Sequence, residues 1–168
     1  MKTLLTVLFF LLSSLSFSQS DAEYWNKWKT NYPLVDIIRI LDYEKHYADS
    51  VEKHPSIPPF YARSAAYRFN AQYIGLVRPL NKSILTSMKT VYKLFNGNPN
   101  FMDTMFASEV LIKLGSDTLW MPVQKQLLEA LNQEIKKGDT LTLFCLYLNE
   151  HSVTNGLRNI FLISEFSK

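Results

Sequence analysis

The segment His54-Pro55-Ser56-Ile57-Pro58-Pro59 constrains the fold more than any other part of the sequence. Each proline lacks a backbone N–H and has a fixed φ, so three prolines in five residues cannot continue a helix. Before this segment, apolar residues recur at helical spacing from Leu34 to Lys53. After it, apolar and polar residues begin to alternate. The sequence therefore predicts a helical N-terminal arm over residues 19–58 and an α+β domain over residues 59–168.

Residues 1–18 have the pattern of a secretory signal peptide. Lys2 precedes an apolar stretch from Leu4 to Leu12, and Ser16-Phe17-Ser18 has the small residues of a cleavage site. The apolar stretch is shorter than the roughly 20 residues that span a bilayer. We therefore expect cleavage before Gln19 and export of the remaining chain, either to the periplasm or as a secreted protein.

The composition is that of an ordinary soluble domain. Of the 168 residues, 47% are apolar and 20% are charged, with a formal net charge of +3, so the chain does not have the composition of a disordered protein. No cluster of Lys and Arg stands out, so we expect no nucleic-acid partner. Cys145 is the single cysteine, which excludes an internal disulfide.

Residues 64–78 fit two patterns. Tyr67, Phe69, Ala71 and Tyr73 alternate with polar residues, as in a strand, yet the apolar positions of this stretch also match a helical stripe. We predict a strand because the alternation is strict and Gly75 suits a bulge better than a helix interior.

The rest of the chain supplies three further kinds of signal: helix caps, turn residues and apolar runs. They predict a helix after Asn81, a hairpin around Gly115-Ser116-Asp117, a helix from near Pro122 to Gly138, and strands over 140–148 and 159–166. The predicted order after the arm is β-α-β-β-α-β-β. Without its first helix this order resembles that of an OB-fold barrel, which implies a five-stranded barrel; an open, mostly antiparallel sheet with two helices is the equal alternative.

Asp42, His46 and Asp49 lie at positions i, i+4 and i+7, so a helix places them on one face. These residue types are metal ligands at ligand spacing. Arg39 and Lys53 lie three and four residues from the two aspartates and offer ion pairs along the helix surface. We therefore favour a solvated surface, keep a metal site as the less favoured alternative, and predict no cofactor.

Catalytic motifs of the common hydrolases are missing, since the sequence contains no G-x-S-x-G, S-x-x-K or H-E-x-x-H. Cys145 and His151 are the residue types of a thiol nucleophile and its base. Cys145, however, lies between Phe144 and Leu146 in the most apolar run of the domain, which is typical of a buried, unreactive thiol.

Four aromatic residues crowd the start of the arm: Tyr24, Trp25, Trp28 and Tyr32. Such a cluster is able to grip a partner, a sugar or a membrane interface, and equally able to pack on its own domain. We favour packing on the domain and keep the four residues as candidate binding residues.

Together these features predict an exported binding module for a protein or glycan partner rather than an enzyme. The alternatives are a small exported hydrolase with a dispersed site, for which His46, Asp49 and His151 are the first residues to test, and an accessory subunit of an exported complex. The sequence predicts neither the partner's identity nor the oligomeric state.

Overall fold

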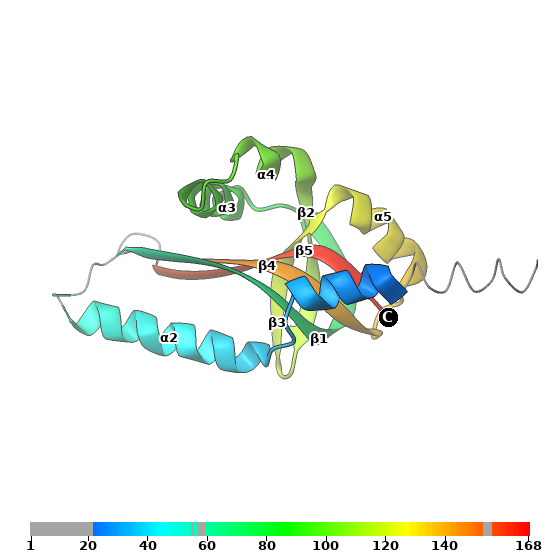
Figure 1. The fold of residues 1–168 in the computed structure, drawn as a ribbon, viewed down its shortest axis with the longest axis horizontal. Helices are drawn as coiled ribbons and strands as arrows, with labels where there is room; N and C mark the ends of the chain where they lie inside the picture. Colours follow the sequence, from blue (N-terminus) through cyan, green and yellow to red (C-terminus); the bar gives the residue numbers. More distant parts are fainter. Residues whose placement is uncertain (1–21, 55, 57–59, 153–155) are drawn as a thin grey trace, which may run out of the picture.

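Five strands form a closed barrel in the order β1-β2-β3-β5-β4 (Figure 1). The computed structural model describes residues 22–54, 56, 60–152 and 156–168. Its named elements are α2 (Ile37–Lys53), β1 (Tyr61–Pro79), α3 (Lys82–Leu94), α4 (Asn100–Met105), β2 (Phe106–Leu114), β3 (Asp117–Gln124), α5 (Lys125–Glu134), β4 (Thr140–Ser152) and β5 (Gly156–Ser167). A further helix covers residues 22–31.

The barrel has the OB-like arrangement that was one of the two alternatives predicted from the order of the elements. β1 is antiparallel to β2 and β4, β2 to β3, and β4 to β5. The parallel pairing of β3 with β5, at Val123 and Ile163, closes the barrel, and α5 connects β3 to β4. The α+β class and the barrel are therefore confirmed, and the open sheet is excluded by this closure.

The ambiguous stretch over residues 64–78 is a strand, as its alternation predicted. It belongs to β1, which continues through a register shift between Tyr73 and Val77. Gly75 lies in this shift with a φ of +79°, a conformation that side chains with a Cβ rarely adopt. The glycine thus makes a bulge within the pairing of β1 with β2.

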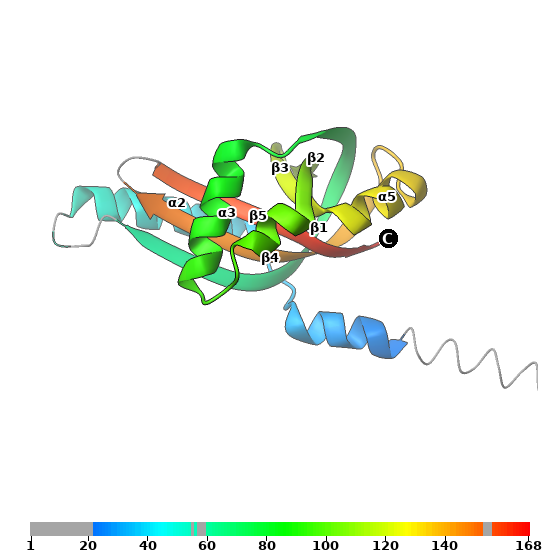
Figure 2. The same cartoon turned by 90° about the horizontal axis from the view of Figure 1, so that it is seen from above.

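β4 is apolar on both faces because both of its faces are covered. Leu143 and Cys145 belong to the larger core cluster with the barrel interior, whereas Leu148 packs in a second cluster with Met88 and Val91 of α3. Figures 1 and 2 show the layers: α2 lies against one face of the β1–β4–β5 sheet and α3 lies across the other. The strand predicted over residues 140–148 is therefore β4, and it lies between β1 and β5.

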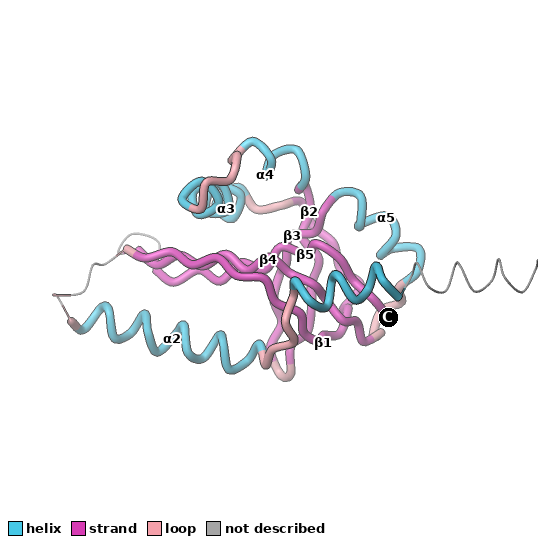
Figure 3. The backbone as a smooth tube through the Cα atoms, viewed as in Figure 1, coloured by secondary structure: helices cyan, strands magenta, loops and turns pink. Residues whose placement is uncertain are grey.

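α2 begins at Asp36, whose carboxylate accepts hydrogen bonds from the N–H groups of Ile38 and Arg39, and it ends before the proline segment. The apolar residues that recur at helical spacing in this segment are not all buried. Leu34 and Ile38 are 62% and 45% exposed, and the buried residues are Ile37, Glu44, Ala48 and Val51. The tube in Figure 3 shows this helix running alongside the sheet. The proposed division between residues 58 and 59 stays a prediction.

Two elements differ from the sequence predictions. Pro122 lies in β3, opposite Glu109, and the helix begins only at Lys125. The strand tolerates the missing N–H because β3 pairs with β5 at Val123 alone. α4 was not predicted; its Met102 side chain is buried in the second core cluster, which holds the short helix against α3.

The predicted signal peptide and its cleavage site lie outside the described residues. Within the described part of the chain, no helix is long and apolar enough to cross a membrane.

Gly75→Ala should destabilise the barrel more than Gly115→Ala does. Both glycines have a positive φ, which costs a residue with a Cβ about 1–2 kcal/mol. At Gly115 an added Cβ meets nothing within 4 Å, whereas at Gly75 it lies 3.1 Å from the Cβ of Lys137. Urea unfolding of the two variants measures the difference, and an equal or smaller loss at Gly75 contradicts the assigned bulge.

Candidate functional site: a cleft between α2 and β1

The aromatic residues of the arm lie on the barrel of their own chain. The rings of Trp25, Trp28 and Tyr32 lie 5.8, 5.6 and 6.0 Å from the ring of Phe144, measured between centroids. The Tyr24 hydroxyl donates a hydrogen bond to Glu165. The four rings thus have neighbours within the fold, and a partner-binding role for them stays a prediction.

The residues considered for a metal site lie on the outer face of α2. His46 Nδ1 lies 3.3 Å from the Asp42 carboxylate and 2.8 Å from the Asp42 backbone oxygen, and both side chains are well exposed. Asp49 is also exposed. In the described part of the chain, no three His, Cys, Asp or Glu side chains gather closely enough to hold a metal ion.

Cys145 and His151 do not form a catalytic pair. They are six residues apart on β4, a separation of about 20 Å along a strand. Cys145 is fully buried, and burial raises the pKa of its thiol well above the usual range. The imidazole of His151 stacks on Tyr61, and its Nε2 lies 3.0 Å from the Glu52 carboxylate.

A cleft of about 780 Å³ lies between the first half of α2 and the first half of β1. The helix contributes one wall and residues 62–65 of β1 contribute the other, while Phe95, at the end of α3, reaches the cleft from the opposite face of the sheet. Tyr147 of β4 also lines the cleft, so residues from four elements meet at this place.

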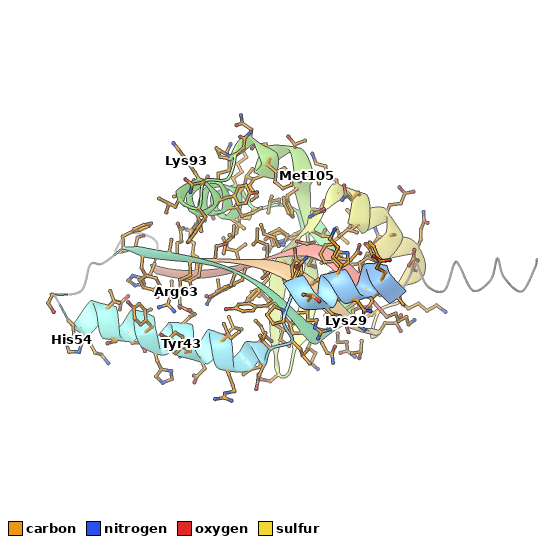
Figure 4. The ribbon with its side chains drawn as sticks, in the orientation of Figure 1. Lys29, Tyr43, His54, Arg63, Lys93 and Met105 are labelled. Carbon is orange, nitrogen blue, oxygen red and sulfur yellow. The ribbon has the colours of Figure 1, made fainter. Side chains whose placement is uncertain are left out.

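An ion pair surrounded by tyrosines forms the wall of the cleft. Arg63 Nη1 donates to Glu44 Oε1 at 3.0 Å. The guanidinium lies over the rings of Tyr43, Tyr47 and Tyr61 at 5.3, 4.5 and 5.5 Å from their centroids. In Figure 4, Tyr43 comes from α2 and Arg63 from β1, and the two lie in the space between helix and strand.

The second oxygen of Glu44 is buried and has no hydrogen-bond partner. The residue is 3% exposed, and burial raises the pKa of its carboxyl, an effect that Arg63 opposes in part. Burial, with a smaller contribution from Glu44, also raises the pKa of Tyr61 to about 12, and its hydroxyl is likewise unpartnered. Buried polar atoms without partners are costly, so both oxygens leave a hydrogen-bonding capacity beside the cleft that the described residues do not use.

Two other polar clusters satisfy themselves. On the α3 side of the sheet, Ser87 donates to the buried carboxylate of Glu150 and accepts from Arg158 at 2.7 Å. On the barrel, Arg78 Nε donates to the buried Glu109 at 2.8 Å. The Glu150 and Glu109 carboxylates each accept a hydrogen bond within their cluster. We therefore interpret both clusters as structural links between elements.

Sequence reasoning missed Glu44 and Arg63. The one available signal is the position of Glu44, seven residues after Ile37 and four before Ala48, which places a carboxylate on the apolar face of α2. A carboxylate at such a position needs a partner from elsewhere in the fold. Nothing in the sequence near Arg63 identifies it as that partner.

No family model, curated protein or solved structure matches this chain.

Glu44→Gln should become more stable relative to the wild type as pH rises from about 4 to about 7. A raised folded-state pKa means that Glu44 stabilises the fold when protonated, and that this stabilisation is lost as pH rises through that pKa. Glutamine does not titrate, so the stability of the variant does not fall in this way as pH rises. Urea unfolding at several pH values measures the difference; a relative stability that stays constant or falls contradicts the assigned burial.

Proposed function

We propose that this protein is an exported binding module for a protein or glycan partner, and that the partner occupies the cleft between α2 and β1. The observation that carries the proposal is the buried carboxylate of Glu44, which lines the cleft with one oxygen unpartnered. A group that donates a hydrogen bond to this oxygen would remove the cost of its burial.

The composition of the cleft supports recognition. Tyrosine and arginine are enriched where proteins bind partners, because they combine a large apolar surface with hydrogen-bonding groups. Tyr43 lines the cleft and is 56% exposed. The ion pair between Glu44 and Arg63 holds the carboxylate and the guanidinium in place beside it. The contacts of Arg63 with Glu44, Tyr43 and Tyr47 link the two walls of the cleft in the absence of a ligand.

The residues that a hydrolase would use are not gathered here. His46 and Asp49 lie exposed on α2, whereas His151 is buried in contact with Glu52 and Tyr61. This separation favours a binding module over a dispersed-site hydrolase. A binding module is also compatible with the role of an accessory subunit. Export is part of the proposal because of the signal-peptide pattern in residues 1–18.

Photo-crosslinking in the exported fraction tests the location of the site. We expect Tyr43→p-benzoylphenylalanine to form one dominant adduct, because this position borders the cleft. His46, one turn further along α2 and 73% exposed on its side chain, is the matched control position. Trp28 tests the aromatic arm in the same way. Adducts that are as abundant at position 46, or that form only at position 28, contradict the proposed site.

A further inference from the structure

Over the first half of β1, the described residues leave most of one edge without a neighbouring strand. β4 pairs with residues 61–72 on one side without a register shift, whereas β2 pairs on the other side only from Gln72 onward. On this second side, before β2 begins, a short extended segment around Leu34 covers the edge at one residue, Arg68. Arg68 donates its N–H to the Pro33 oxygen at 2.9 Å, and its oxygen accepts from the Val35 N–H at 3.0 Å, in a parallel bridge.

The bonds of Arg68 fix the direction of the backbone groups that precede it. In a regular strand, the N–H and C=O of alternate residues point to the same side. Since those of Arg68 point away from β4, those of Ala62, Ser64 and Ala66 do as well. No described residue bonds to the N–H or C=O groups of these three residues. Ala62 and Ser64 also line the cleft, so the unpaired edge opens into it.

We propose that the partner is a polypeptide, and that an extended segment of it adds to β1 as a strand along residues 62–66. This inference rests on the proposed function, because it places the segment in the same cleft. An extended backbone is the ligand whose donors and acceptors alternate with the spacing of this edge. The Pro33–Val35 segment already uses the edge in this way, so the chain contains one example of the pairing.

The charges of the cleft specify one side chain of the segment. Asp36 is engaged as the cap of α2, and Glu44 is paired with Arg63. Among the described residues that line the cleft, Arg39 is the remaining charged side chain, and it is exposed without an ion pair. The added strand therefore carries an aspartate or glutamate that faces α2. The residue next to this acidic residue in the added strand faces the other side of the sheet. Phe95 is 48% exposed there, so we expect that residue to be apolar.

A peptide fits this edge better than a second copy of the chain. The open stretch of five residues is about 16 Å long and ends where Pro33–Val35 begins. Stable interfaces between folded proteins bury about 800 Å² on each partner, which is large for so short a pairing. A glycan lacks the regular alternation of donors and acceptors that the edge offers.

Peptides selected from a phage-displayed library of linear 12-residue sequences are the probe, with the protein from the exported fraction as bait. We expect selected peptides to bind Ser64→Pro at least tenfold more weakly than the wild type, by fluorescence anisotropy. Proline removes the edge N–H of residue 64 but no bond to β4, because this N–H points away from β4. Ser64→Ala keeps the N–H and is the matched control, with binding within twofold of the wild type.

Two further measurements keep the inference testable if Ser64→Pro fails to fold. Methylation of the peptide's backbone nitrogens, one at a time, should weaken binding to the wild type at alternate positions only. Arg39→Gln should weaken binding about threefold to tenfold, and added salt should reduce this difference. A peptide that tolerates methylation at every position overturns strand addition.

The outcomes separate the inference from the proposed function. If Ser64→Pro binds as the wild type while Tyr43→Ala binds weakly, the cleft is the site and strand addition is wrong. If all three variants, at positions 39, 43 and 64, bind as the wild type, both proposals fail. Failure to select any peptide, together with binding on a glycan array, overturns the polypeptide partner. A dimer that Ser64→Pro abolishes identifies a second copy as the occupant and overturns the peptide.

Discussion

The pairing of β1 with two different strands determines the rest of the structure. Its first half, residues 61–72, pairs with β4, and its second half pairs with β2 from Gln72 onward, through the bulge at Gly75. The second half closes the barrel, and the first half continues with β4 and β5 as a sheet that extends from it, as Figure 1 shows. Helices cover both faces of the extension, and among the described residues no strand lies beside one edge of the first half of β1.

The candidate site is a consequence of how that extension is covered. α2 buries an apolar stripe on one face, and Glu44 lies within the stripe. Arg63, on the facing side of β1, compensates one oxygen of this carboxylate and is surrounded by tyrosines from both elements. The same packing forms the cleft beside the open edge of β1. One ligand is therefore able to contact the side chains of the cleft and to pair with the backbone of this edge.

The periodicity of the sequence predicted which segments are helices and strands better than it predicted what those segments pack against. The alternation of Tyr67, Phe69 and Ala71 predicted a strand, because alternation is a local property of the sequence. The order of strands and helices left an OB-like barrel and an open sheet as equal alternatives, and the pairing of β3 with β5 decides between them. The prediction for Pro122 was wrong because a strand that is weakly paired on one side accepts proline. The open edge and the partner of Glu44 depend on contacts between residues distant in sequence, which no local pattern encodes.

Amide hydrogen exchange of the free protein, followed residue by residue by NMR, tests the central claim most directly. The claim is that residues 62–66 of β1 offer an unpaired edge. The account predicts fast exchange at Ala62, Ser64 and Ala66, and slow exchange at Arg63 and Ala65, whose N–H groups face β4. Equal protection of all five amides would contradict the account, because it would mean that this edge already has a partner within the fold.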